Sequence, residues 1–406
     1  MRSALNTYQR NCFVEGLLFS MAWTMHVVFH IKTVGFDNFM VVFMGTLYEV
    51  SIMCFEVPTG VVADLVSRRL SASVGWFILG LGFFVEGLFP VAWVVICAQL
   101  LLGFGETFVS GAHDAWVADE LPHSDPGVDS GTAFLKGQQS SFIGRIIGAW
   151  IAVLFTLVSL PAVMMASGLG FMCFAFVAFA TMSEKGFHKS DEQRHFWATF
   201  REGYKLVQKS KILLLILAVS VFYGLASEGF DRLWNKAIMD LNQLPAVGSF
   251  GTDFWWPVFS TAAILGGMFV NKQVQLRVKT DNSSSIASAL TAMTVVLICT
   301  IAGFALSQSI WIGAALFVVS RALRRGIEPL IKTWINLNAP SENRATLLSF
   351  GGQAHSLGEI AGGPMVGTIG KLRTAKDAIF VAALLLLPTL PFLAKAKRTP
   401  SESELA

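Results

Sequence analysis

The residues best able to do chemistry in this chain are charged side chains that interrupt long apolar runs. In a helix that crosses a membrane, each such side chain costs about 2.5 to 3.5 kcal/mol at the helix centre, so it needs a partner or a function. Eight of them are our candidates for holding a polar ligand or carrying a proton: Glu49, Glu56, Glu106, Asp114, Arg145, Glu228, Arg321 and Glu359.

Helical spacing brings some of these side chains together. Glu49 and Glu56 are seven residues apart and share one helix face, and Glu228 is spaced to pair with Arg232. A carboxylate removed from water holds its proton more tightly than it does in water. We therefore expect at least one of four acids to carry a proton, with Glu228 and Glu359 next in line. The four are Glu49, Glu56, Glu106 and Asp114.

The densest group of charges lies between residues 321 and 332. Its members recur every three or four residues and so form one stripe on a helix: Arg321, Arg324, Arg325, Glu328 and Lys332. Arginine keeps its charge when buried, so the stripe must face a polar interior and needs carboxylates or an anionic ligand. We expect Glu106 or Glu49 to neutralise Arg321, the deepest member of the stripe. The alternative is a set of ion pairs between helices that only locks one conformation.

The composition identifies the elements that carry these side chains. Of 406 residues, 54% are hydrophobic and 14% are charged, against about 25% charged in a typical soluble chain. The chain is therefore predicted to be an integral membrane protein with about twelve spans of some 20 apolar residues each. The runs are 11–31, 39–63, 70–89, 91–118, 133–158, 161–183, 212–235, 254–275, 286–306, 310–336, 346–370 and 375–394.

The two halves of the chain resemble one another, which indicates an internal repeat. Two sets of residues recur in the same order: Trp116, Pro122, Gln139, Gly144 and Gly148 in the first half, and Trp334, Pro340, Gln353, Gly358 and Gly362 in the second. A parallel repeat of this kind places a substrate site near the bilayer midplane between the halves. We expect a six-helix bundle over 1–183, a cytoplasmic linker over 184–211, and a second six-helix bundle with a short cytoplasmic tail over 212–406.

Lysine and arginine in the loops give the expected orientation. Most of them fall on the side that holds both termini, so the positive-inside rule makes both termini cytoplasmic. We expect residues 119–132 to form a polar loop. We also expect His26, His30 and Lys32, toward the outer end of the first span, to lie at the membrane interface.

A short charged break separates the second span from the third. Four of its residues match the signature G-x-x-x-D-r-x-G-r-R: Gly60, Asp64, Arg68 and Arg69. Leu65 and Ser67 replace the usual Arg and Gly. In this loop the chain resembles the major facilitator superfamily. That resemblance implies an all-α membrane fold of about twelve helices in two pseudo-symmetric six-helix bundles, in which this loop is a conformational latch; the alternative is an ordinary positive-inside loop.

A second motif lies in the eleventh span and consists of Gly358, Gly362, Gly363 and Pro364. Small residues four apart let helix backbones approach closely, and the proline bends the helix. The stretch is similar to the glycine-proline motif of antiporters in the family, although there it normally lies in the fifth helix. We expect a helix-packing hinge, with packing alone as the alternative.

The resemblance implies a secondary transporter that moves a small organic solute by alternating access. Residues 48–49, 56–60, 110–116 and 344–349 look like bacterial drug and small-molecule efflux members, which implies proton-coupled antiport by a multi-pass protein of the bacterial inner membrane. The alternatives are a proton-coupled importer of an anionic metabolite or chelate, and a membrane sensor that transports nothing. No G-x-x-x-x-G-K-[ST], H-E-x-x-H or G-x-S-x-G motif is present, so we expect no enzyme, cofactor, metal or nucleic-acid partner. Lipid, a small-molecule substrate and protons are the expected partners of a monomer.

Overall fold

The computed structural model describes residues 3–187, 193–340 and 343–399, and within them all regular structure is helical. The chain groups into two compact units. Unit 1 comprises Met1–Phe36, Leu47–Asp191 and Pro245–Thr261, and unit 2 comprises Asp37–Thr46, Glu192–Leu244 and Ala262–Ala406. Each unit is described by itself below, and the sequence-based division into two halves at 184–211 stays a prediction.

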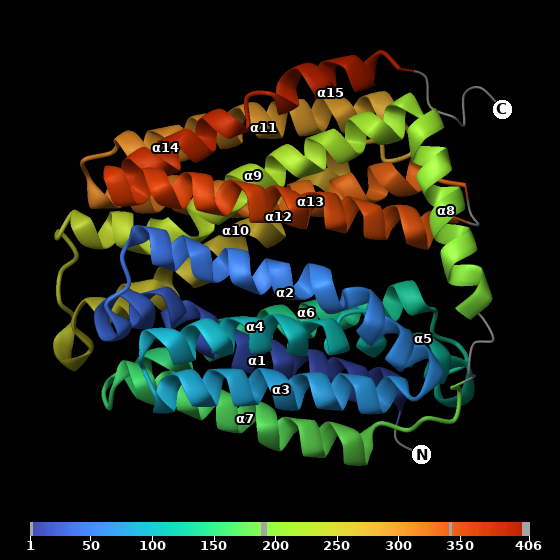
Figure 1. Ribbon diagram of the computed structural model, residues 1–406, viewed down its shortest axis with the longest axis horizontal. Coiled ribbons are helices and arrows are strands. Elements are labelled where there is room, and N and C mark those ends of the chain that lie inside the picture. The colour runs from blue at the N-terminus through green and yellow to red at the C-terminus, as the bar shows by residue number, and fades with distance from the viewer. Residues whose placement is uncertain (1–2, 188–192, 341–342, 400–406) are drawn as a thin grey trace. The chain divides into compact units, whose positions relative to one another are not determined.

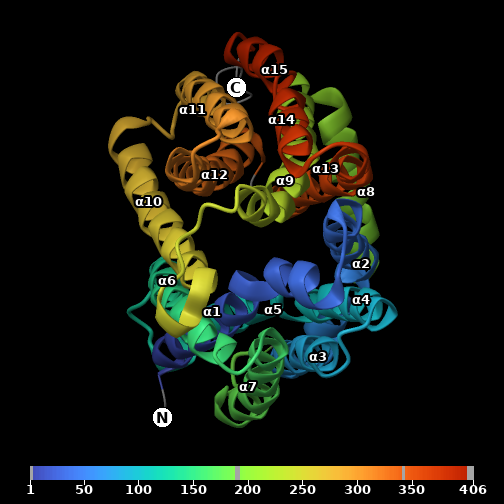
Figure 2. The ribbon, with the colours of Figure 1, turned by 90° about the vertical axis from the view of Figure 1, so that its left-hand side faces the viewer.

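Unit 1 contains most of the first seven helices. They are α1 (Ala4–Phe29), the π-helix η1 (His30–Val34), α2 (Asn38–Leu65), α3 (Arg68–Leu88), α4 (Ala92–Val109), α5 (Ala112–Ser124), α6 (Ser130–Thr156) and α7 (Leu160–Thr181), joined by the 3-10 helix η2 (Gly248–Phe254). The first turns of α2 belong to unit 2. Helix α1 packs against α6 and α7, while α3 packs against α4 and α7 (Figures 1 and 2).

Unit 2 contains the remaining helices. They are α8 (Gln193–Lys209), α9 (Lys211–Asp240), α10 (Trp255–Arg277), α11 (Ser283–Leu306), α12 (Ile310–Asn338), α13 (Arg344–Leu372), α14 (Ala375–Leu385) and α15 (Thr389–Lys397). The first turns of α10 belong to unit 1. Helix α9 packs against α13, α14 and α15, and α11 packs against α12 and α14 (Figures 1 and 2).

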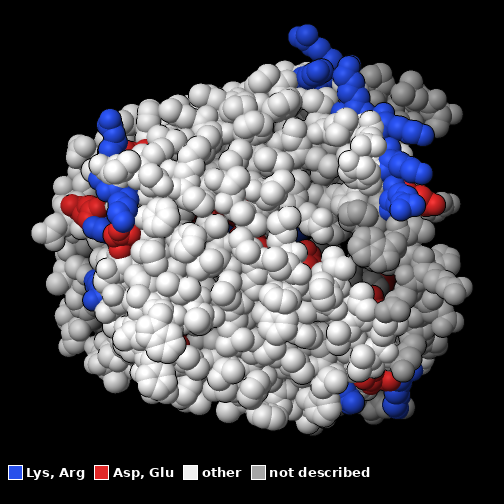
Figure 3. Space-filling model, in the orientation of Figure 1, with Lys and Arg blue, Asp and Glu red and all other residues white. Residues whose placement is uncertain are grey.

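The helices have the length that a membrane requires. Nine spans in the described residues are long and apolar enough to cross a bilayer, with α4 and α5 together forming one of them. Helices α10, α12 and α13 are at least as long as the shortest of these but more polar. In all, this agrees with the twelve spans predicted. On the face shown in Figure 3, Lys and Arg gather near helix ends and most of the remaining surface is uncharged.

The structure corrects two boundaries expected from the sequence. The span predicted at 91–118 breaks at Ser110 and Gly111, where Gly111 takes a φ of +77°, which favours glycine. Its continuation, α5, runs to Ser124 into the stretch that we expected to be a loop. Polar residues there are stable in a helix because Glu120 is hydrogen-bonded, accepting from the Gly186 amide at 2.6 Å. The predicted linker likewise contains a helix, α8.

Local capping explains where several helices begin. Side chains at N-cap positions accept hydrogen bonds from amides of the first turn at seven of the described helices, the N-caps being Ser3, Ser67, Asp129, Ser159, Ser210, Asn282 and Thr374. At α6, hydrogen bonds from the side chain and amide of Thr132 lower the pKa of the Asp129 carboxyl below its ordinary value. That carboxylate therefore keeps its charge at the positive end of the helix dipole.

Glycines set the distance between the two main helix pairs. In unit 1, a Cβ at Gly144 or Gly148 of α6 would overlap a carbonyl oxygen of α1, those of Phe13 and Leu17. In unit 2, Gly358 and Gly362 of α13 stand in the same relation to carbonyl oxygens of α9, those of Val221 and Leu225. The two pairs of glycines are those matched by the sequence repeat. Backbone contact at small residues is what holds helices together in a membrane, where lipid is as apolar as the helices themselves.

Gly358→Ala is expected to lower the midpoint of thermal unfolding in detergent, because its methyl group must displace the α9 backbone. Overpacking of this kind costs about 1 to 3 kcal/mol. Gly352→Ala on the same helix is the matched control, since its Cβ would meet no atom within 4 Å. Its higher helix propensity should leave stability unchanged or raise it by up to about 1 kcal/mol. Equal effects of the two variants would contradict the close contact.

Candidate functional site

Each unit holds a cluster of charged side chains on its membrane-spanning helices. We call the group around Glu15, Glu106, Asp114 and Arg145 the acidic cluster of unit 1. We call the group around Asp231, Arg321 and Arg324 the arginine cluster of unit 2. Six of the eight candidates predicted from the sequence belong to these clusters or lie beside them: Glu106, Asp114, Arg145, Glu228, Arg321 and Glu359. The other two, Glu49 and Glu56, lie on α2.

In the acidic cluster, α1 and α5 are joined by hydrogen-bonding groups. The Tyr8 hydroxyl donates to Asp114 Oδ1 at 2.6 Å, and His113 Nδ1 lies 3.8 Å from Glu15 Oε2. The imidazole of His113 also packs between two aromatic rings. Its centroid lies 4.7 Å from that of the Tyr8 ring and 5.0 Å from that of the Trp76 ring. The break at Gly111 positions this set, because it starts α5 just before His113 and Asp114.

Arg145 supplies positive charge to the acidic cluster. It lies on α6 next to Gly144, where α6 touches α1, and it interacts electrostatically with Glu15 and Glu106. Its Nε donates to Ser141 Oγ at 3.4 Å. Atom Oε2 of Glu106 is buried and accepts no hydrogen bond from the described residues. Two carboxylates thus share the field of this guanidinium, so a proton or a cationic or hydrogen-bonding ligand could balance the remaining negative charge.

In the arginine cluster, one carboxylate serves two guanidinium groups. Asp231 of α9 accepts a hydrogen bond from Arg324 Nη1 at 2.6 Å and another from Arg321. We expected Glu106 or Glu49 to neutralise Arg321, and Asp231 takes that place instead. Asp231 lies on a helix packed against α12, whereas spacing along the sequence cannot show which acid on another helix meets a given arginine.

Two further polar groups of unit 2 lie on α9. Arg232 Nε donates to Glu228 Oε2 at 3.2 Å, which confirms the pairing expected from their spacing. The Ser227 hydroxyl donates to Glu359 Oε1 at 2.8 Å, and His355 Nε2 lies 3.4 Å from the same oxygen. Glu228 also interacts electrostatically with Glu359 and Asp231. Opposite and like charges are therefore coupled along one face of α9.

Two other candidates lie on α2. Glu49 and Glu56 are both half-buried. Within the described residues the Glu56 carboxylate makes no hydrogen bond or ion pair, and no neighbouring charge acts on it. At the far end of the arginine stripe, Lys332 pairs with Glu328 at 2.8 Å, and both side chains are exposed. The stripe is thus half-buried at Arg321 and Arg324 and open at its end.

A family model identifies the class of protein to which these helices belong. The model described as the Major Facilitator Superfamily matches residues 11–363. The chain belongs to this superfamily. It is also 22% identical over 382 residues to the uncharacterized MFS-type transporter YxaM of Bacillus subtilis (strain 168), a match that covers 92% of this chain and 90% of YxaM.

Solved structures with a similar fold are MFS transporters. A mutant form of the nucleoside transporter NupG aligns with a TM-score of 0.81 at 12% identity over 97% of this chain and 100% of that one. A bacterial homolog of the human lysosomal transporter Spinster aligns with a TM-score of 0.75 at 13% identity, covering 97% and 96% of the two chains. A POT family transporter in complex with 5-aminolevulinic acid gives a TM-score of 0.75 at 12% identity, with the same coverage. The all-α membrane fold predicted from the sequence is thereby confirmed.

The MFS signature loop is held within unit 1 by charged contacts. Arg68 Nη1 donates to the Ala115 carbonyl at 2.9 Å and to Asp119, while its Nη2 lies 3.5 Å from Asp64 Oδ1. The Arg69 amide donates to Glu184 Oε1 at 3.1 Å, and the same carboxylate accepts from Ser67 at 2.7 Å. Ser67, which replaces the usual glycine, is also the N-cap of α3. The loop therefore binds α3 to α5 and to the end of α7; its role as a latch, and that of Gly60, stays a prediction.

The glycine-proline stretch of this MFS chain lies in an unbroken helix. Helix α13 continues through Pro364, and Gly358 and Gly362 face α9. A Cβ at Gly363 would overlap the Thr46 hydroxyl at the start of α2. Close packing is therefore present at three of these positions, and a hinge motion at Pro364 stays a prediction.

The eight candidates predicted from the sequence leave out several residues in or beside the clusters, among them Glu15, Asp231 and His355. Glu15 lies in the apolar run 11–31 and could have been found by the rule that selected the others. Asp231 adjoins the predicted Glu228–Arg232 pair and was available by the same rule. His355 had no such signal, because only the fold places its imidazole beside Glu359.

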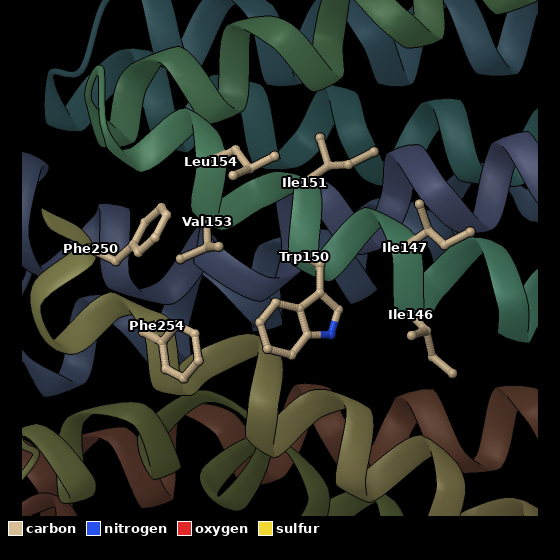
Figure 4. Close-up of a pocket in the computed structure, with 8 residues that line it drawn as sticks. All are labelled: Ile146, Ile147, Trp150, Ile151, Val153, Leu154, Phe250 and Phe254. Carbon is tan, nitrogen blue, oxygen red and sulfur yellow. The ribbon is translucent and has the colours of Figure 1, made fainter. Parts of the chain in front are cut away.

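A pocket elsewhere in unit 1 differs in chemistry from both clusters. It has a volume of about 360 Å³ and lies between α6 and η2 (Figure 4). Its lining is apolar: Ile146, Ile147, Trp150, Ile151, Val153, Leu154, Phe250 and Phe254. Since no charged side chain lines it, this pocket is suited to an acyl chain and not to the recognition of a charged solute.

Asp231→Asn is expected to destabilise the protein, because Arg321 and Arg324 lose the carboxylate that they share. Hydrogen bonds to charged groups contribute about 1.5 to 3 kcal/mol each, and partial exposure places the effect toward the lower end. Glu328→Gln is the control, since that exposed pair with Lys332 contributes less than about 0.5 kcal/mol. Thermal unfolding in detergent measures both. A loss of stability in Glu328→Gln as large as that in Asp231→Asn would refute a special role for Asp231.

Proposed function

We propose that this MFS transporter couples the movement of a small polar organic solute to the movement of protons. The observation that carries the proposal is the acidic cluster of unit 1, in which Glu15 and Glu106 share the field of one cation, Arg145, and Asp114 adds a further like charge that acts on Glu15. An excess of carboxylates over cations away from water is stable only if protons or a positively charged ligand balance it. The cluster can therefore take up and release protons as the transporter opens it first to one side of the membrane and then to the other.

Glu106 is the acid best placed to exchange a proton with the solute. Its Oε2 atom is buried without a hydrogen bond from the described residues, whereas the Asp114 carboxylate is exposed and bonded to Tyr8. A solute that donates a hydrogen bond to Glu106, or attracts Arg145, changes the balance of charge around the remaining acids. Solute binding and proton binding are then linked, each altering the affinity for the other.

The proposed direction is export, in exchange for protons. It is supported by the likeness of residues 48–49, 56–60, 110–116 and 344–349 to bacterial efflux members. We further propose an inner-membrane location with both termini cytoplasmic, supported by the basic residues at the C-terminal end of α15 and by Arg68 and Arg69 in the first turn of α3. A reporter fused to the C-terminus, active only in the cytoplasm, tests this orientation; an inactive fusion would reverse it.

Glu106→Gln is expected to abolish proton-driven flux and to spare exchange of solute for solute, because the substitution keeps the shape of the side chain and removes its titration. Proteoliposomes loaded with a pH-sensitive dye report proton movement when single nucleosides, dipeptides or amphipathic cations are added. Glu56→Gln, at an acid with no ion-pair partner in the described residues, is the comparison.

The outcome separates three cases. Loss of coupling only in Glu106→Gln supports the acidic cluster. Loss only in Glu56→Gln moves the proton site to α2. Normal pH dependence in both variants, and in Glu15→Gln, removes the cluster from the coupling mechanism. Absence of any solute flux from protein that is folded and correctly inserted would favour a membrane sensor.

Import of an anionic metabolite or chelate is a second candidate, favoured by the arginine cluster of unit 2. Asp231 is the single carboxylate bonded to Arg321 and Arg324 in the described residues, so the pair of guanidinium groups has capacity for one more anionic partner. A carboxylate or phosphate ligand can bind such planar groups through two parallel hydrogen bonds. Uptake driven by an inward proton gradient would distinguish this candidate from export.

Arg321→Lys and Arg321→Gln test the second candidate. If Arg321 holds an anion, the lysine variant keeps the charge but loses the planar fork, and both variants should bind the solute about 10- to 100-fold more weakly, corresponding to about 1.4 to 2.7 kcal/mol. Binding measured at several pH values checks this. Unchanged affinity and unchanged pH dependence in both variants would reduce Arg321 to a structural partner of Asp231.

A further inference from the structure

Two histidines and one glutamate meet in the interior of unit 1. None of the three belongs to the acidic cluster of the proposed transport mechanism. His26 of α1 and His30 at the start of η1 face Glu86 of α3. Atom Nε2 of His26 lies 2.8 Å from Glu86 Oε1, and Nε2 of His30 lies 3.7 Å from Glu86 Oε2. One donor atom from each residue can be chosen so that all three lie within 4.8 Å of one another.

The cluster is fully buried, which corrects our expectation that both histidines lie at the membrane interface. Each imidazole is 1% exposed, and Glu86 and Gln99 are 0% exposed. The histidines are four residues apart, so they share the face of α1 that packs inside unit 1. The polar histidines suggested an interface because the sequence could not show that Glu86, 60 residues further along the chain, lies beside His26 in the fold.

The surroundings hold these three side chains in place. Gln99 of α4 donates to Glu86 Oε2 at 3.1 Å, and the Trp23 indole stacks on the His26 ring with centroids 4.8 Å apart. The π-helical turn His30–Val34 begins at the second histidine. A π-helical turn is costly in a regular helix and recurs at functional sites, where it re-aims a side chain.

The chemistry of these groups matches that of a zinc site. Neutral imidazole nitrogens and a carboxylate oxygen are common zinc ligands, and two histidines with one glutamate are a known set of three protein ligands for zinc. Donors in a tetrahedral zinc site, with bonds of about 2.0 to 2.2 Å, lie some 3.3 Å apart. The two separations between histidine and carboxylate, 2.8 and 3.7 Å, lie on either side of that value but end on different oxygens of Glu86. Donor atoms taken one from each residue lie within 4.8 Å of one another, so rotations of the side chains would have to bring the donors closer to bind an ion.

We propose that His26, His30 and Glu86 bind a divalent transition-metal ion of the zinc class within unit 1. Gln99 acts as a positioning residue, since its amide holds the carboxylate that would ligate the ion. The Gln99 amide nitrogen also lies 3.4 Å from His26 Nε2, and its amide oxygen is buried without a hydrogen-bond partner in the described residues.

The position of the cluster makes the ion a structural one. All the side chains are buried, so the ion would enter before unit 1 has closed and would then dissociate slowly. It would join α1 to α3 and balance the charge of Glu86 without the need for a proton. Binding to the folded state alone raises the free energy of unfolding in proportion to the logarithm of the free metal concentration.

The test uses the full chain, expressed in medium supplemented with Zn²⁺ and purified through a tag that contains no histidine. After dialysis against a chelator, the metal content of the wild type should be about one zinc ion per chain. A second sample grown with Co²⁺ should show the visible absorption bands of a cobalt ion with nitrogen and oxygen ligands. His26→Gln, His30→Gln and Glu86→Gln should each lose both signals, and Gln99→Leu should bind the metal about 10- to 100-fold more weakly.

His123→Gln is the matched control, because His123 is a histidine of α5 that lies at the protein surface and bonds to the Asp119 carbonyl, away from the cluster. It should keep the metal and the cobalt spectrum of the wild type. If a cluster variant fails to fold, the zinc content and cobalt spectrum of the wild type still test the proposal. Wild-type protein that holds no zinc after chelation and shows no cobalt bands would overturn the proposal and leave a cluster that holds protons. Equal metal loss in His123→Gln and His26→Gln would overturn it as well.

Discussion

A charge inside a membrane-spanning helix is stable only where another part of the protein neutralises it, and this constraint accounts for the polar interior of both units. In unit 2 it joins α12 to α9, since Arg321 and Arg324 both require Asp231. In unit 1 it joins α6 to α1, through the field that Arg145 exerts on Glu15. The polar side chains that suggest a transport function are thus also the ones that specify which helices become neighbours.

Backbone contact at glycine allows these charges to meet. Gly144 and Gly148 bring α6 against α1, and Arg145 follows Gly144 directly in the sequence. Glu359 follows Gly358 in the same way, and its carboxylate reaches Ser227 on the neighbouring helix α9. In both units a helix pair with no side chain between its backbones presents a polar group right beside the contact. The repeat preserves this geometry while the polar residue differs, basic in unit 1 and acidic in unit 2.

The sequence was sufficient for the class of fold and for most of the helices, because apolar length and loop charge are local properties. It also predicted the Glu228–Arg232 pair, which depends only on spacing along one helix. It was insufficient wherever a partner came from another helix. The acid that meets Arg321 was predicted wrongly, and His26 and His30 were assigned to the interface, because neither Asp231 nor Glu86 is related to its partner by any periodic spacing. The break at Gly111 was missed for a different reason, since a single glycine in an apolar run is usually a packing residue.

The glycine contacts also determine which parts of the chain can move independently. Where the carbonyl groups of α1 and α9 touch α6 and α13 directly, sliding or tilting one helix of a pair would drive backbone atoms into one another. Each pair is therefore expected to move as one rigid body when the protein changes conformation. Deformation is left to the places where the helical hydrogen bonds are interrupted, which include the junction of α4 and α5 at Ser110 and Gly111 and that of α14 and α15 at Leu386 to Pro388. Asp114 lies just beyond the break between α4 and α5. Bending at that break would change the orientation of its carboxylate without disturbing the contact between α1 and α6.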